Sequence, residues 1–176
     1  DRIRSRGLEM CIRDSLCRDA EASGSLDTQS TDRSWVLADL EATRALGRWL
    51  VEQPDRPCLL MLEGPLGAGK TSLVQGIAAA LGIDEPITSP TFALSQHYPQ
   101  GSPPLVHLDL YRLEIPAAAN DLFLQEEEEA LSMGALLVVE WPERLSLPLP
   151  EAWTLTLAHR SDGGRRATLM LSLIHI

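Results

Sequence analysis

Residues 64–71 of the sequence read GPLGAGKT, which fits the pattern G-x-x-x-x-G-K-[ST] of a phosphate-binding loop. Its glycines allow the backbone to curl with N–H groups pointing inward, in conformations that a Cβ would obstruct. Lys70 is expected to reach the β- and γ-phosphates of a nucleotide, and Thr71 carries a hydroxyl placed to bind Mg²⁺. The stretch therefore predicts a site for a nucleoside triphosphate built largely from backbone groups.

The segments on either side of the loop match the strand and the helix that such a loop joins. Before it, residues 58–62 form a continuous apolar run that is typical of a buried strand. After it, apolar residues recur at helical spacing as far as Gly82. Because this helix begins at the loop, the positive end of its dipole adds to the phosphate site. The alternative, a glycine-rich turn without a ligand, is disfavoured by this context.

Composition indicates a globular protein and restricts its direct partners. The chain has 176 residues, of which 44% are hydrophobic and 23% charged, as in an ordinary soluble domain. Its formal net charge is −10, which does not favour binding to a nucleic-acid backbone. If the protein serves a nucleic-acid pathway, we expect a basic partner to hold the nucleic acid.

The two ends of the chain differ from its middle. Residues 1–32 are polar and lack periodicity, so we expect a disordered or non-native extension, and residues 172–176 are a doubtful tail. The extension has no apolar region of a secretory signal, and no apolar run approaches the roughly 20 residues of a membrane span. We therefore expect a single domain over residues 33–171 of a cytoplasmic protein that does not contact membranes.

Apolar strands and amphipathic helices alternate through this middle region. Besides the segments around the loop, we expect strands at 35–37, 92–98, 105–111 and 135–139 and helices at 40–51, capped by Asp39, and 117–132. Alternating segments at 153–157 and 166–171 flank a turn at 161–164 and predict a hairpin. The pattern predicts an α/β fold: a mostly parallel sheet flanked by helices, with an antiparallel C-terminal hairpin and a ligand site at the carboxyl ends of the parallel strands.

Two acids follow predicted strands and are candidates for the nucleotide site. Asp109 suits an acid that holds Mg²⁺ or its water at a strand end. Glu140 could ligate the metal or polarise an attacking water as a general base. An ordinary capping or solvated acid is the alternative at both positions. Trp141 is equally compatible with packing beside the nucleotide and with a place in the core.

Three further features have less specific interpretations. The stretch Ser89-Pro90-Thr91 lies in a loop after the first helix of the site, where a hydroxyl could sense the γ-phosphate and its metal; a simple turn is the alternative. We interpret His107 as a structural residue or a packing neighbour of the site. The run Glu126 to Glu129 is most simply a solvated helix face that lies away from the phosphates.

Four segments in order resemble the TsaE (YjeE) family of bacterial ATPases of tRNA threonylcarbamoyladenosine biosynthesis. They are GPLGAGKT at 64–71, SPTF at 89–92, HLDLYRL at 107–113 and VVEW at 138–141. The resemblance covers residues 35–171. It implies an ATPase needed for threonylcarbamoylation of adenosine 37 in tRNAs that read ANN codons, acting with TsaB and TsaD and touching tRNA only through that complex.

The resemblance also implies roles for particular residues. ATP phosphates would be bound by Gly67, Ala68, Gly69, Lys70 and Thr71, and Mg²⁺ by Thr71 and Glu140. Asp109 would be a second acid of the metal and hydrolysis site, Thr91 would lie in a switch-like loop, and Thr43 would approach the adenine side.

Two other functions remain open from the residues alone. One is a P-loop kinase for a small metabolite, although the sequence shows no convincing arginine-rich lid. The other is a binding module in which ATP orders the loop around Thr91 without significant turnover.

Overall fold

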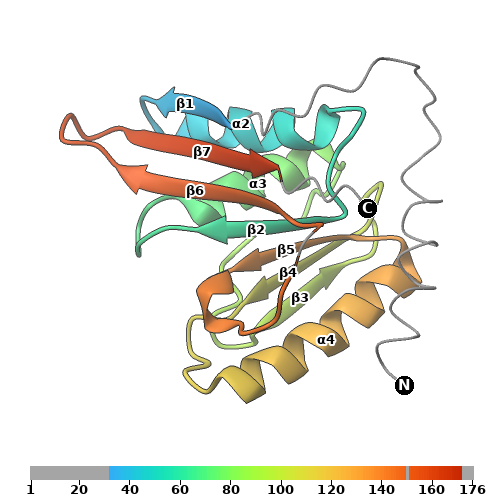
Figure 1. Ribbon diagram of the computed structural model, residues 1–176. Coiled ribbons are helices and arrows are strands. Elements are labelled where there is room, and N and C mark those ends of the chain that lie inside the picture. The colour runs from blue at the N-terminus through green and yellow to red at the C-terminus, as the bar shows by residue number, and fades with distance from the viewer. Residues whose placement is uncertain (1–31, 150, 172–176) are drawn as a thin grey trace, which may run out of the picture.

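The computed structural model describes residues 32–149 and 151–171. Nearly all of the predicted N-terminal extension and the whole of the predicted tail at 172–176 lie outside these residues. The described chain forms one seven-stranded sheet with helices on both faces, as Figure 1 shows. The strands are β1 (Arg33–Leu37), β2 (Leu59–Glu63), β3 (Ser95–Tyr98), β4 (Leu105–Asp109), β5 (Leu136–Glu140), β6 (Trp153–His159) and β7 (Arg165–Leu171). The helices are α2 (Leu40–Glu52), α3 (Lys70–Ala80), α4 (Pro116–Met133) and the short 3₁₀ turn η1 (Pro142–Arg144).

The order of strands across the sheet is β1-β7-β6-β2-β5-β4-β3. The four central strands β6, β2, β5 and β4 run parallel to one another. The outer strands pair antiparallel: β7 with β6, β1 with β7, and β3 with β4. The carboxyl ends of β2, β4 and β5 therefore meet at one edge of the sheet, where the phosphate loop begins.

The two faces of the sheet bury different side chains because successive residues of a strand point to opposite sides. On one face, Leu60 and Leu62 of β2 pack in a core with α2 and α3. On the other, Leu59 and Met61 pack in a second core with α4. All four leucine and methionine side chains of β2 are at most 3% exposed, which explains the continuous apolar run of a strand covered on both faces.

Two glycines allow α2 and α3 to approach each other closely. A Cβ at Gly47 would come within 2.2 Å of the Leu73 carbonyl oxygen, and one at Gly76 within 2.0 Å of the Arg44 carbonyl oxygen. Backbone against backbone leaves no room for a side chain at either position. This contact holds the first helix of the fold against the helix that carries the phosphate loop.

The predicted fold class is confirmed, and the differences from prediction are local. Asp39 caps α2 as expected, its Oδ1 accepting the Ala42 N–H. The strand predicted from residue 92 begins only at Ser95, because residues 91–94 form a turn in which Leu94 has a φ of 67°. The strand predicted to end at 111 ends at Asp109.

One prediction about the acidic run of α4 is wrong at its first residue. Glu126 is only 6% exposed, because its Oε2 accepts hydrogen bonds from Ser95 Oγ at 2.8 Å and pairs with His97 Nε2 at 2.6 Å. The carboxylate thus ties α4 to the edge strand β3 instead of facing solvent.

Within the described residues, the structure contains no helix with the length and apolarity needed to cross a membrane.

Candidate functional site

A cavity of about 360 Å³ opens at the carboxyl ends of the parallel strands, where ligands bind in open α/β sheets. The residues that line it are Leu40, Leu66, Gly67, Gly69, Lys70, Thr71, Ser72, Ser89, Thr91, Asp109, Tyr111, Glu140 and Trp141. A larger cavity of about 570 Å³ lies at the opposite end of the sheet, beside Pro57 and Ala135. We place the site in the smaller cavity because the phosphate loop and both strand-end acids line it.

The phosphate loop joins β2 to α3 through conformations that suit glycine. Gly67 and Gly69 have φ angles of 77° and 104°, in the left-handed region where a Cβ is strained. Ala68 donates its N–H to the Pro65 carbonyl at 3.1 Å and closes the turn. Gly69 is the N-cap of α3, so the positive end of the helix dipole faces the cavity.

Lys70, the first residue of α3, folds back over the loop. Its Nζ donates to the carbonyl oxygens of Gly64 at 2.6 Å and Pro65 at 3.1 Å, and lies 4.4 Å from the ring centre of Trp141. Burial lowers the pKa of Lys70 below its ordinary value, and the nearby carboxylate of Glu140 opposes this effect. The ammonium group is thus held by neutral carbonyls and a ring face, and an anion would be a stronger partner.

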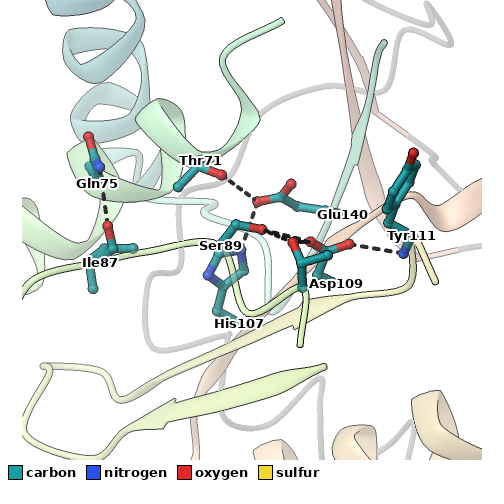
Figure 2. A network of polar contacts seen from close by, with 9 residues as sticks. Thr71, Gln75, Ile87, Ser89, His107, Asp109, Tyr111 and Glu140 are labelled. Carbon is teal, nitrogen blue, oxygen red and sulfur yellow. Dashed lines mark hydrogen bonds and ion pairs between the residues drawn. The ribbon is translucent and has the colours of Figure 1, made fainter. Parts of the chain in front are cut away.

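Glu140, the last residue of β5, is 3% exposed and holds the centre of the polar network in Figure 2. Its Oε1 accepts a hydrogen bond from Thr71 Oγ1 at 3.3 Å and lies 2.8 Å from His107 Nε2. The carboxylate and the Thr71 hydroxyl come from β5 and α3, 69 positions apart in sequence. The fold therefore brings together Thr71 and Glu140, two of the three residues that were predicted to hold a metal.

His107 is a residue of the site that sequence reasoning assigned only to structure or packing. It is fully buried, and its Nδ1 has no hydrogen-bond partner in the described part of the chain. This arrangement fits the tautomer that carries its proton on Nε2 and donates it to Glu140, because a proton on Nδ1 would be buried and unpaired. The alternation of side chains along β4 could have indicated this, since His107 lies two positions from Asp109 and therefore on the same face of the strand.

Asp109 anchors the loop that carries Ser89 and Thr91. Its Oδ2 accepts hydrogen bonds from Ser89 Oγ at 2.7 Å and Thr91 Oγ1 at 3.0 Å, while its Oδ1 accepts the Tyr111 N–H at 2.9 Å. Figure 2 shows Ser89 and Asp109 side by side below Glu140. The carboxylate is 2% exposed, and its backbone pairs with that of Glu140 across β4 and β5.

A second tether joins the same loop to α3. Gln75 Nε2 donates to the Ile87 carbonyl at 3.1 Å, and its Oε1 accepts two hydrogen bonds from Arg44 of α2. Figure 2 places this contact beside the Thr71 end of the network. The loop is thus held at Ile87 by α3 and at Ser89 and Thr91 by β4.

The predicted site residues fall into two groups. Eight of them line the cavity: Gly67, Gly69, Lys70, Thr71, Thr91, Asp109, Glu140 and Trp141. The other two, Ala68 of the loop and Thr43 of α2, are fully buried. The Thr43 hydroxyl donates to the Asp39 carbonyl, and its methyl lies 3.5 Å from where a Cβ of Gly69 would be. The structure thus places Thr43 against the loop backbone and not among the residues that line the cavity.

Sequence reasoning also missed the apolar part of the lining. Leu40, Leu66 and Tyr111 line the cavity, and Tyr111 packs against Trp141 with ring centres 4.9 Å apart. Single exposed apolar residues in turns carry little signal in a sequence, because such residues are common on any surface.

The oxygen atoms of the site fit a magnesium ion. Mg²⁺ binds oxygen ligands and commonly takes only one or two carboxylates, with phosphates and waters completing its coordination. Thr71 and Glu140 provide a hydroxyl and a carboxylate in contact, and Asp109 provides a second carboxylate on the adjacent strand. In the described residues, no group of three or more His, Cys, Asp or Glu side chains could hold a metal by itself. The donor set therefore suits an ion shared with phosphates.

Comparisons with known proteins agree with this geometry. The family model described as "Threonylcarbamoyl adenosine biosynthesis protein TsaE" matches residues 37–167. A tRNA threonylcarbamoyladenosine biosynthesis protein TsaE from Nostoc sp. is 42% identical over 134 residues, covering 76% of this chain and 82% of the relative. The protein of the same name from Bacillus subtilis is 33% identical over 135 residues, with the same coverage of both chains.

A solved structure supports the fold independently of the curated sequences. The crystal structure of YdiB from Bacillus subtilis superimposes with a TM-score of 0.63 at 25% identity, covering 84% of this chain and 90% of the other. The seven-stranded sheet flanked by helices is therefore a P-loop NTPase fold. With the family model spanning most of the described residues, and with relatives at this level of identity, the chain belongs to the TsaE family.

Proposed function

We propose that this protein is a cytoplasmic ATPase that acts in forming threonylcarbamoyladenosine at position 37 of tRNAs that read ANN codons. Relatives that are named as tRNA threonylcarbamoyladenosine biosynthesis proteins support the pathway. The observation that carries the activity is the cavity in which the phosphate loop residues Lys70 and Thr71 face the buried carboxylate of Glu140. We propose residues 33–171 as the single unit that holds this site.

The phosphate loop would bind the β- and γ-phosphates of ATP. Lys70 would exchange its contacts with the Gly64 and Pro65 carbonyls for phosphate oxygens, because a charged acceptor forms the stronger hydrogen bond. The backbone N–H groups of Gly67, Gly69, Lys70 and Thr71, at the N-terminus of α3, would share the remaining phosphate charge.

Thr71, Glu140 and Asp109 would hold Mg²⁺, directly or through water. When bound, the ion would neutralise charge that develops on the phosphates. His107 donates to Glu140 and keeps its carboxylate directed toward Thr71. Glu140 would therefore remain in place either as a ligand or to orient the attacking water.

The loop from Ile87 to Thr91 would respond to the nucleotide. Ser89 and Thr91 donate hydrogen bonds to Asp109, and both residues line the phosphate cavity. A γ-phosphate and its ion would compete for the same hydroxyls, so the loop has two alternative sets of partners. A partner that binds one arrangement of the loop would thereby control hydrolysis.

ATP hydrolysis by the protein alone, with the TsaB–TsaD pair, and with tRNA added tests this function. We expect low activity alone that rises with the pair, because Asp109 holds the loop hydroxyls that would otherwise reach a γ-phosphate and its ion. No change with the pair, in a preparation shown to bind ATP, would refute gating by these partners. Phosphoryl transfer that depends on a small acceptor would instead indicate a kinase, and tight binding without turnover a binding module.

A further inference from the structure

The β6–β7 hairpin lies directly behind the phosphate loop. Figure 1 shows its two strands, orange to red, beside β2, from which the loop emerges. The loop begins at Gly64, where a Cβ would come within 2.4 Å of the Leu157 carbonyl oxygen of β6. Loop and hairpin therefore touch through their backbones, and any side chain that bridges them acts on the shape of the loop.

Arg165, the first residue of β7, is that side chain. Its guanidinium donates to four backbone carbonyls: Nε to Ala68 at 3.1 Å, Nη2 to Gly67 at 3.2 Å, and Nη1 to Gly163 at 2.9 Å and Gly164 at 3.2 Å. Two of these carbonyls belong to the phosphate loop and two to the hairpin turn. The planar fork of Arg suits this arrangement, since it presents several N–H groups in fixed directions.

These contacts determine where two amide groups of the loop point. In a planar trans peptide, the N–H points opposite to the C=O. Holding the Gly67 carbonyl therefore directs the Ala68 N–H away from Arg165, toward Pro65, to which it donates. Holding the Ala68 carbonyl directs the N–H of Gly69, the cap of α3, in the same way.

The turn between β6 and β7 holds the Arg165 guanidinium on the side away from the phosphate loop. Asp162 accepts hydrogen bonds from Arg160 and from the Gly164 N–H, and these contacts hold the pKa of its carboxyl below the usual range. Gly163, with a φ of 87°, completes the turn. The guanidinium is thus fixed at one side by this turn and contacts the loop with the other.

We propose that Arg165 is a positioning residue that holds the phosphate loop in its nucleotide-binding conformation from behind. It acts through the backbone of Gly67 and Ala68, and its positive charge adds to the field of the cavity. This role rests on the proposed binding of ATP, and it assigns to the C-terminal hairpin a direct part in phosphate recognition.

Two variants and a neighbouring control separate charge from geometry. Arg165→Lys keeps the positive charge but loses the fork, and Arg165→Gln loses both. Arg166→Gln is the matched control, because Arg166 is exposed and, among the described residues, its hydrogen bond is a long one of 3.5 Å to Ser34 Oγ. The affinity for ATP with Mg²⁺ is measured by calorimetry, the stability by urea unfolding, and the Ala68 and Gly69 amide signals by NMR without nucleotide.

We expect both Arg165 variants to bind ATP about 10-fold or more weakly, as is typical when a residue that orients a ligand is lost. The Ala68 and Gly69 signals should shift in both, while Arg166→Gln changes neither quantity. Unshifted amides or unchanged affinity in Arg165→Lys, with the wild type binding ATP, would overturn the role. A wild-type protein that binds no nucleotide would refute the proposed function, and the amide shifts would still decide whether Arg165 positions the loop.

Discussion

Lys70 is the only lysine in the 176-residue sequence, and it lies in the phosphate loop. Burial lowers the pKa of Lys70, so burying the protonated side chain reduces the free energy of unfolding. Because the folded pKa lies below the unfolded value, this penalty is fully present at low pH. Stability rises as the pH passes from the folded pKa toward the ordinary value of about 10.5. The desolvation that disfavours the charged Lys70 side chain also favours its pairing with an anion.

This leads to a measurement on one side chain. Protein labelled at the lysine ε-carbon should give a single NMR signal, whose titration midpoint lies below the ordinary lysine value without nucleotide. ATP should move that midpoint upward, because a nearby phosphate favours the charged form. A midpoint at or above the ordinary value, measured without nucleotide, would contradict the desolvation of Lys70 that the structure indicates.

Glu140 can be tested with a substitution that preserves its shape. In Glu140→Gln, the side-chain carbonyl can still accept from Thr71 and His107, so the fold and ATP binding should persist. Hydrolysis stimulated by the TsaB–TsaD pair should fall about 100-fold or more, the range for loss of a general base. Glu143→Gln is the control, because Glu143 is an exposed acid nearby on η1. Normal hydrolysis by Glu140→Gln would remove Glu140 from the proposed chemistry.

At the scale of elements, the close contact between α2 and α3 holds α3, the helix that begins at the end of the phosphate loop. Gly76→Ala would gain about 1 kcal/mol of helix propensity at an exposed site. At Gly76, however, the added methyl would meet the Arg44 carbonyl oxygen at 2.0 Å, and a backbone atom cannot rotate away. We expect the clash to prevail and the free energy of unfolding to fall by about 1–3 kcal/mol, as measured by urea titration.

Ala79→Ser, an exposed change on the same helix, is the control for the glycine variant and should alter stability little. If Gly76→Ala were as stable as the wild type or more stable, the two helices would have to be more loosely packed than the structure shows. Affinity for ATP should fall together with stability, because α3 carries Lys70 and Thr71.

Most of the elements could be predicted because their signals are local. The apolar run of β2, the glycines of the loop and the cap at Asp39 each depend on neighbouring residues. What could not be predicted depends on contacts between distant segments. Glu126 is held by Ser95 and His97, which β3 brings beside it from about 30 positions away. β6 lies parallel to β2 although the paired residues Leu60 and Trp153 are 93 positions apart.

The site follows the same division. The phosphate loop and the acids at Asp109 and Glu140 were predictable, because strand ends and glycine patterns mark them. His107 could be interpreted only as a structural residue or a packing neighbour of the site, since its partner Glu140 is 33 positions away on another strand. Arg165 contacts the loop across 97 positions, so no local pattern connects the two.

At the scale of the whole molecule, the net charge bears on whether the protein can bind tRNA directly. The net charge is −10, and several basic side chains are already engaged. Arg48 pairs with Glu41, Arg160 pairs with Asp162, and Arg165 is held by backbone carbonyls. A nucleic-acid backbone binds a protein largely through Lys and Arg side chains that can neutralise phosphates. An ATPase of this charge would therefore act in a tRNA pathway through the surface of another protein.

The protein alone should not bind tRNA at about 0.15 M salt, even near 10⁻⁴ M, the weak end of ordinary non-specific binding. Fluorescence polarisation of labelled tRNA measures this directly. With TsaB and TsaD present, adding the protein should leave the slope of log affinity against log salt unchanged, because that slope counts phosphates neutralised by the partners. Micromolar binding of tRNA by the protein alone, with a steep salt dependence, would instead place RNA contacts on this chain. Arg166 and Arg112 would then be the first residues to replace. Arg166 has a long hydrogen bond to Ser34 of β1, and Arg112 is stacked on the exposed ring of Phe92.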